Sequence, residues 1–195
     1  VTIDSATLMN KALEVIEARW LFGVPYDRIE VVVHRQSIIH SMVEFQDGSV
    51  KAQMGPPDMR FPIQCALMYP DRVENPSLPR FDPVRMGPLT FDELDSSQYP
   101  CFDLALKTAR RGGTWPAALV GADEAAVALF LDGKINFTDI SSVVEAALSR
   151  HRPLPEPTID DIITASAEAF DEAWSVADPQ PAAWSARGAM RLDTA

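Results

Sequence analysis

The chain of 195 residues has little of several features that would identify its class at once. Its two cysteines, Cys65 and Cys101, have no CxxC spacing, which excludes a disulfide framework and a zinc knuckle, and their apolar neighbours indicate buried, reduced thiols. No apolar run approaches the roughly 18 residues of a membrane span, so we expect no membrane segment. With 17 Lys and Arg against 28 Asp and Glu, the chain has too few cations to bind nucleic acid or an anionic membrane by bulk charge.

Motifs that identify common chemistries are also missing. The sequence contains no GxGxxG, no Walker A loop and no nucleophile elbow of the Ser/His/Asp hydrolases. The N-terminus has no initiator Met and no basic and apolar leader, so we expect a piece of a longer chain rather than a signal peptide. A composition of 47% hydrophobic and 23% charged residues is typical of a globular domain with a buried core.

The first part of the chain predicts an α+β fold, a small mostly antiparallel or mixed sheet with flanking helices. Residues 1–3 resemble the end of a strand, and a helix is expected from residue 7. Asp4 or Ser5 is the expected N-cap of this helix, and Gly23 its end. The helix is predicted from an apolar stripe at helical spacing, formed by Met9, Leu13, Ile16 and Trp20.

Three strands and a further helix are expected after this segment. Ile29–Val33 is short, β-branched and apolar, as a buried strand is. Residues 39–46 and 49–54 flank Asp47-Gly48, a dipeptide suited to a hairpin turn with positive φ. A helix is expected over residues 59–69.

After Pro100 the pattern is helical almost throughout and predicts a C-terminal four-helix bundle. The expected helices span residues 102–111, 116–131, 138–150 and 158–176, with Thr138 and Thr158 as N-caps of the last two. The expected domains are residues 1–70 as part of a central domain, 71–98 as a linker loop rich in Pro, 99–177 as the bundle and 178–195 as a mobile tail.

The first helix carries a polar arc opposite its apolar stripe. At about 100° per residue, Asn10, Glu14 and Lys11 fall at about 100°, 140° and 200° from Met9. Such a set can hold a metal ion with Glu14 and an anionic oxygen with Asn10 and Lys11, and Ser5 adds a donor for a phosphate. The alternative is a solvated face with a Lys11–Glu14 ion pair, which spacing alone favours.

The other polar residues have simpler expected roles. His34 and His40 are each expected to be a hydrogen-bonded structural histidine or a substrate contact, because their spacing does not suit one metal. His151 is expected as a cation at a helix C-terminus. The pairs Asp123-Glu124 and Asp160-Asp161 are expected to be solvated helix charges.

Several segments together resemble one enzyme family. The longest is VTIDSATLMNKALEVIEA at residues 1–18, followed by WLFG at residues 20–23. Further matching segments are VH at 33–34, QSIIHSMV at 36–43, QDGS at 46–49, PDMR at 57–60, YP at 99–100, FTDI at 137–140 and TIDD at 158–161. From residue 1 to about 177, the sequence resembles the C-terminal portion of the 1-deoxy-D-xylulose 5-phosphate reductoisomerase family.

The resemblance implies an activity. The family rearranges 1-deoxy-D-xylulose 5-phosphate to an aldehyde and reduces this with NADPH to 2-C-methyl-D-erythritol 4-phosphate, using Mg²⁺ or Mn²⁺, in non-mevalonate isoprenoid biosynthesis. It also implies a homodimer formed through the central sheet, for which the hairpin of residues 39–54 is the candidate, and a bacterial cytoplasmic or plastid-type location.

The resemblance further implies roles for individual residues. Glu14 and Lys11 are the implied catalytic residues, and Glu14 is the implied metal ligand. The implied substrate-binding residues are Ser5, Asn10, Lys11, Ser37 and His40. Met59 is implied to lie near the nicotinamide of NADPH.

The sequence departs from the family at a few positions. Arg35 stands where the family has Pro, Ala12 where it has Gly, and Val120 and Asp123 where it has Asn. The family's NADPH-binding domain, its Asp-Ser-Glu metal-binding run and its loop over the substrate have no counterpart here. We therefore expect no NADPH oxidation by these residues alone, and an alternative is a non-catalytic remnant that serves as a dimerisation or interaction module.

Overall fold

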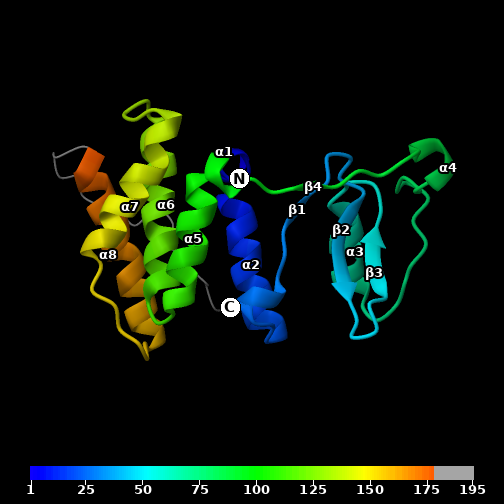
Figure 1. Cartoon of the computed structure of the whole chain (residues 1–195), viewed down its shortest axis with the longest axis horizontal. Coiled ribbons are helices and arrows are strands. Elements are labelled where there is room, and N and C mark those ends of the chain that lie inside the picture. Colours follow the sequence, from blue (N-terminus) through cyan, green and yellow to red (C-terminus); the bar gives the residue numbers. More distant parts are fainter. Residues whose placement is uncertain (178–195) are drawn as a thin grey trace, which may run out of the picture. The chain divides into compact units, whose positions relative to one another are not determined.

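The structure is a computed structural model that describes residues 1–177 (Figure 1), and the expected tail at 178–195 lies outside the described residues. The chain forms two compact units. The helical unit contains residues 1–29 and the helices after residue 94, and the hairpin unit contains residues 30–94. These units group the first helices with the C-terminal ones, whereas the domain boundaries expected at residues 70 and 98 stay a prediction.

The helical unit is built from helices and short helical turns. Their bounds are α1 Thr2–Thr7, α2 Met9–Phe22, η1 Tyr26–Arg28, η2 Ser96–Gln98, α5 Pro100–Arg111, α6 Trp115–Leu131, η3 Phe137–Asp139, α7 Ile140–Arg150 and α8 Ile159–Ala177. The four predicted helices after Pro100 are confirmed as α5 to α8. Because α2 also packs against α5, the helical unit extends beyond these four helices, and the up-and-down bundle order stays a prediction.

Small side chains line the centre of the helical unit. Helix α6 packs against α5, α7 and α8, and its fully buried residues are Ala118, Leu119, Ala122, Ala125, Ala126 and Leu129. At Gly121 of the same helix, an added Cβ would lie 1.9 Å from the backbone oxygen of Ser166 on α8. The absence of a side chain therefore allows α6 and α8 to approach with their backbones in contact.

The hairpin unit holds two small antiparallel sheets. Its elements are β1 Val32–Val33, β2 Ile39–Glu44, β3 Val50–Met54, α3 Arg60–Met68, α4 Pro83–Met86 and β4 Asp92–Glu93. Strand β2 pairs with β3, as the Asp47-Gly48 turn predicts, and β1 pairs with β4. The expected buried strand at 29–33 is wrong in length and burial, because β4 supplies two residues for pairing and Val32 remains 42% exposed.

The N-terminal segment also differs from the expectation. Residues 1–3 form no strand, since Thr2–Thr7 is helical, and Asp4 and Ser5 lie inside α1 instead of capping α2. Leu8 separates the two helices. Gly23 ends α2 in the left-handed conformation as predicted, but Trp20 is 68% exposed and lies outside the buried face. That face consists of Met9, Ala12, Val15 and Ile16.

Hydrogen bonds at the helix termini support one of the two expected threonine caps. Thr158 and Asp161 bond to each other's backbone N–H at the start of α8. Thr138 does not cap α7, because Asn136 and Asp139 form the capping box one element earlier, at η3.

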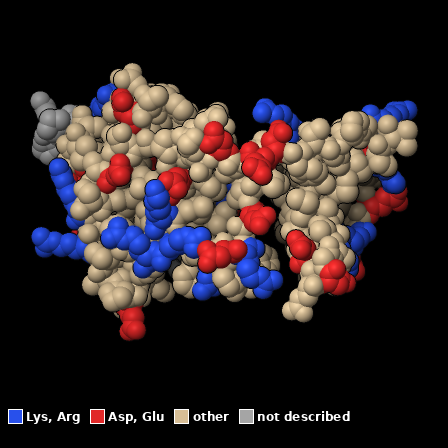
Figure 2. Space-filling model, viewed as in Figure 1, with Lys and Arg blue, Asp and Glu red and all other residues tan. Residues whose placement is uncertain are grey.

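The surface charges of the helical unit include neighbouring ions of opposite sign. Figure 2 shows blue Lys and Arg side chains next to red Asp and Glu side chains. Two such pairs are Arg110 with Asp27, at 2.7 Å, and Lys107 with Asp103, at 2.5 Å. Within residues 1–177, no helix is long and apolar enough to cross a membrane.

Candidate functional site

The junction between α1 and α2 sets the geometry of the first group of candidate residues. Leu8 has φ 57° and ψ 15°, a left-handed conformation that is unusual for a bulky side chain. The buried Thr7 hydroxyl accepts a hydrogen bond from the Met9 N–H at 3.3 Å, and the Ala12 N–H donates to the Leu8 carbonyl at 3.0 Å. The junction therefore places Ser5 on one helix and Asn10 with Lys11 in the first turn of the next.

Asn10, Lys11 and Glu14 form a polar triad on α2. The Lys11 Nζ lies 2.6 Å from Glu14 Oε2, and the Asn10 Nδ2 donates to Glu14 Oε1 at 3.4 Å. The side chains of Lys11 and Glu14 are 40% and 46% exposed, so a ligand in solution can reach both. The structure confirms the predicted arc and also the predicted Lys11–Glu14 pair, so the arc holds balanced charge as it stands.

Ser5 lies apart from the polar triad on α1. Its hydroxyl donates to the Val1 carbonyl at 2.8 Å and is exposed. In the first turn of α2, the N–H groups of Asn10 and Lys11 have no carbonyl four residues earlier within the same helix. The residues expected to bind an anion, Ser5, Asn10 and Lys11, thus come from two helices joined at Leu8.

The fit of a divalent metal rests on Glu14. Hard cations such as Mg²⁺ prefer several oxygen ligands, and Glu14 supplies one carboxylate. Within the part of the chain that the structure describes, no group of three or more His, Cys, Asp or Glu side chains is placed to hold a metal. These residues therefore fit a metal as one ligand among several, and further oxygens must come from elsewhere.

Two candidate residues of the hairpin unit occupy irregular backbone. Ser37 has φ 51°, and its N–H donates to the His34 carbonyl at 3.0 Å to close a turn. Ile39 pairs with Met54 and Ser41 pairs with Gln53, so the residues on either side of His40 face adjacent residues of β3. His40 is therefore the extra residue of a β-bulge. Bulges re-aim side chains near functional sites.

The remaining expected contacts in this unit are local. The His40 Nε2 lies 3.1 Å from the Gly55 carbonyl, in keeping with a structural histidine. Met59 lies at the N-cap of α3 and is 71% exposed. The Asp58 carboxylate next to it bonds to Arg60, which lowers the pKa of Asp58 to about 2.

His34 is held by the segment that leads into β4. Its Nδ1 lies 2.8 Å from the Thr90 carbonyl, and its ring stacks on Phe91 with centroids 4.7 Å apart. Arg35 reaches Asp92 at 3.4 Å. Arg35, which stands where the family has Pro, thus forms an ion pair with Asp92. The turn at Ser37 is closed by its own hydrogen bond to His34.

Two expectations about charged residues are wrong. Asp123 is 7% exposed rather than solvated, and burial first, then the carboxylates of Asp4 and Glu124, raise the pKa of Asp123 to about 7. His151 does cap α7, but burial lowers its pKa, which opposes the positive charge expected there. Its Nε2 lies 2.9 Å from the Thr114 hydroxyl.

Three structural features of the helical unit have little or no signal in the sequence. No local signal marks Leu8 as left-handed, because Leu rarely adopts that conformation. Thr7 is expected only as the start of a helix, although a threonine one residue before a helix N-cap is a recognisable acceptor for the first turn. Asp123 lies on a helix as expected, but its burial depends on packing.

Comparison with known families and proteins gives a consistent result. The family model "DXP reductoisomerase C-terminal domain" matches residues 54–171, and the model "1-deoxy-D-xylulose 5-phosphate reductoisomerase C-terminal domain" matches residues 1–22. The 1-deoxy-D-xylulose 5-phosphate reductoisomerase of Acetivibrio thermocellus is 58% identical over 163 residues, which cover 84% of this chain and 42% of the relative. The enzyme of Geobacillus kaustophilus is 54% identical over 172 residues, which cover 87% of this chain and 45% of the relative.

Solved structures agree with this result. The reductoisomerase of Zymomonas mobilis in complex with NADPH has a TM-score of 0.85 and 43% identity, and covers 90% of this chain and 46% of its own. A reductoisomerase in complex with NADPH, fosmidomycin and magnesium has a TM-score of 0.81 and 39% identity. The match covers 88% of this chain and 44% of the solved one. The chain spans less than half the length of these relatives, and it belongs to the 1-deoxy-D-xylulose 5-phosphate reductoisomerase family as a C-terminal portion.

Proposed function

We propose that these residues form the C-terminal portion of an NADPH- and metal-dependent reductoisomerase that acts on 1-deoxy-D-xylulose 5-phosphate. The observation that carries the proposal is the polar triad, in which Asn10 and Lys11 both bond to Glu14 at the start of α2. The same three residues lie in the segment matched by the family model over residues 1–22. A phosphorylated sugar and a divalent cation are the ligands that this donor set suits.

Charge balance in the triad supports binding of an anion and a cation together. As it stands, the Lys11 ammonium neutralises the Glu14 carboxylate. A phosphate that takes Lys11 and Asn10 leaves both Glu14 oxygens without their donors. A divalent cation then restores the balance at Glu14, so each ligand favours the other.

The other proposed contacts follow the same division of roles. Ser5 donates to the phosphate from α1. Ser37 and His40 are proposed as substrate contacts and Met59 as a contact of the nicotinamide because of the resemblance to the family. In the reaction, the metal supplies polarisation of the substrate's oxygens. Lys11 and Asn10 hold the phosphate end and keep the reacting carbons in place, which lowers the entropic cost of the rearrangement.

Binding measurements on the full-length polypeptide test this assignment. We expect E14Q to weaken Mn²⁺ binding, and K11Q to weaken binding of the phosphonate fosmidomycin, each by about 10- to 100-fold, because each loses a charge-assisted contact. E17Q, an exposed glutamate on the same helix, serves as the control and should change neither affinity. Unchanged binding in E14Q and K11Q would contradict the proposal.

A second proposal, an interaction module, is favoured by the surface of the hairpin. Met42, Val50 and Met54 are 44%, 55% and 41% exposed and lie on one face of the hairpin, because Met42 pairs with Ala52 and Glu44 with Val50. A contiguous exposed apolar patch of this kind is typical of a protein interface. We propose that β2 and β3 contribute to a homodimer.

The free thiols Cys65 and Cys101 fit a reducing compartment, so we place the protein in a bacterial cytoplasm or a plastid-type compartment.

A further inference from the structure

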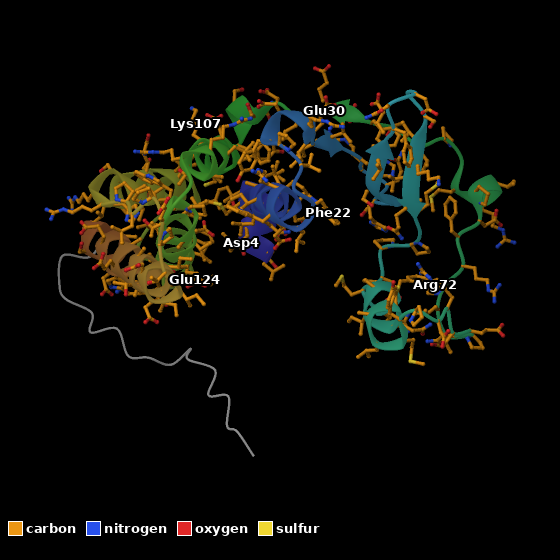
Figure 3. All side chains as sticks on the ribbon, turned by 90° about the horizontal axis from the view of Figure 1, so that it is seen from below. Asp4, Phe22, Glu30, Arg72, Lys107 and Glu124 are labelled. Atoms are coloured by element: carbon orange, nitrogen blue, oxygen red, sulfur yellow. The ribbon has the colours of Figure 1, made fainter. Side chains whose placement is uncertain are left out.

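Residues 88–93, from the segment expected as a linker loop, contact the turn of residues 34–37 in the hairpin unit. Strand β1 ends just before this turn and pairs with β4, although the two strands are far apart in the sequence. Figure 3 labels Glu30 just before β1, and Arg72 in the stretch through which the chain returns to β4. The returning segment therefore lies against the turn that contains Ser37, one of the proposed substrate contacts.

All three polar groups of Thr90 contact this turn. The Thr90 carbonyl lies 2.8 Å from the His34 Nδ1, and because a carbonyl can only accept, this ring nitrogen carries the proton. The Gln36 Nε2 donates to the Thr90 hydroxyl at 3.0 Å, and the Gln36 Oε1 accepts from the Thr90 N–H at 3.4 Å. Thr90 thus holds the side chains of both His34 and Gln36, and we call these three residues the Thr90 clasp.

Ser37 follows the clasp directly and has an unusual backbone conformation. Its φ of 51° lies in the left-handed region, which residues other than glycine rarely adopt. On one side, the Ser37 N–H donates to the His34 carbonyl at 3.0 Å. On the other side, Ile38 is 2% exposed, and its carbonyl accepts a hydrogen bond from the Gly55 N–H at 2.9 Å. A conformation of this kind persists only where its neighbours hold it, and the Thr90 clasp is the side-chain part of that support.

We propose that Thr90 is a positioning residue, which acts through Gln36 and the turn to keep the Ser37 hydroxyl directed at the substrate. For its consequence in substrate binding, the inference rests on the proposed function, which assigns Ser37 to the phosphorylated sugar. The effect of the clasp on the turn stands without that assignment. Without the clasp the turn populates further conformations, and the apparent affinity for substrate falls in proportion to the fraction of molecules in which Ser37 is in place.

Hydrogen exchange of the Ser37 N–H in the full-length protein tests the clasp without any ligand. We expect faster exchange in T90V, which lacks the hydroxyl, and in Q36L, which lacks the amide, whereas T90S keeps the hydroxyl and should exchange as the wild type does. D92N is the matched control, because it removes an exposed ion pair, Arg35 with Asp92 at 3.4 Å, between the same two segments and should leave the exchange unchanged. Equal exchange rates in the wild type, T90V and Q36L would overturn the inference.

Steady-state kinetics of the full-length protein test the consequence for substrate. We expect the KM for 1-deoxy-D-xylulose 5-phosphate to rise roughly three- to ten-fold in T90V and in Q36L, with kcat little changed, because the lost contact holds the substrate and the transition state alike. T90S and D92N should keep the KM of the wild type.

The S37A background shows whether Thr90 acts through Ser37. In S37A, the further change T90V should raise the KM no more, because the two changes remove the same contact. A rise in KM by the same factor with and without the Ser37 hydroxyl would overturn the positioning role. A wild type without turnover would contradict the proposed function instead, while the exchange rates would still decide the effect of the clasp on the turn.

Discussion

At the scale of single residues, burial decides the charge of the ionisable side chains in the helical unit. Asp123 is buried and His151 half-buried, and in both cases burial is the largest cause that shifts the pKa towards the neutral form. Asp58 shows the opposite case, because its bonds to Arg60 favour the charged form and lower the pKa of Asp58. Neighbours and solvent access, rather than residue type, set these protonation states.

His151 gives a pH-dependent contribution to stability. Burial, with Arg111 adding to it and Glu168 opposing it, lowers its pKa below the ordinary value of 6.5. The unfolded chain therefore binds the proton more readily, and the free energy of unfolding falls as the pH drops below about 6.5. We expect H151Q, which does not titrate, to lose less Tm than the wild type between about pH 7.5 and about pH 5.5. An equal loss of Tm in both proteins would show that His151 is not coupled to folding.

At the scale of elements, irregular backbone positions place the candidate residues. Leu8 turns the chain between α1 and α2, Ser37 closes a turn, and His40 sits in a bulge of β2. Each of these positions costs conformational free energy that the surrounding packing must offset. Regular elements on either side, such as α2, supply the rigid support that a binding site needs.

The contact between α6 and α8 depends on a glycine. In G121A the new methyl group would overlap the Ser166 carbonyl, and neither helix backbone can yield without loss of packing. We expect G121A to lower the free energy of unfolding by about 1–3 kcal/mol. Chemical denaturation measures this change. S142A, on the exposed face of α7, is the control and should stay within about 0.5 kcal/mol of the wild type.

Local signals in the sequence predicted the elements whose causes are local. The Asp47-Gly48 turn, the end of α2 at Gly23 and the Lys11–Glu14 pair follow from turn chemistry and helical spacing. Leu8 and Asp123 could not be predicted, because a left-handed leucine and a buried carboxyl group arise from tertiary packing of the helices rather than from local sequence. Trp20 fits the helical period but lies outside the face of α2 that is buried.

At the scale of the whole molecule, the described residues supply part of a site. Glu14 offers one metal ligand, and the apolar side chains of the hairpin remain exposed. Both observations agree with a chain that matches less than half of each relative's length. We therefore expect these 195 residues alone to oxidise no NADPH, and a full-length polypeptide to be the catalytic unit.

The proposed homodimer gives a test at the same scale. We expect the full-length protein to sediment as a dimer, and M42E or V50E to shift it towards the monomer, because each buries a charge in an apolar contact on the same face of the hairpin. S142A, at an exposed position of α7, serves as the control and should leave the dimer unchanged. Dimers of unchanged stability in both hairpin variants would place the contact elsewhere.

Turnover by the full-length protein tests the central claim most directly. NADPH oxidation is measured with 1-deoxy-D-xylulose 5-phosphate and Mg²⁺ for the wild type, K11Q and E17Q. The account predicts turnover by the wild type and by E17Q, and a loss of kcat/KM of about 10- to 100-fold in K11Q. A wild type without turnover, or a K11Q protein with unchanged kcat/KM, would contradict it.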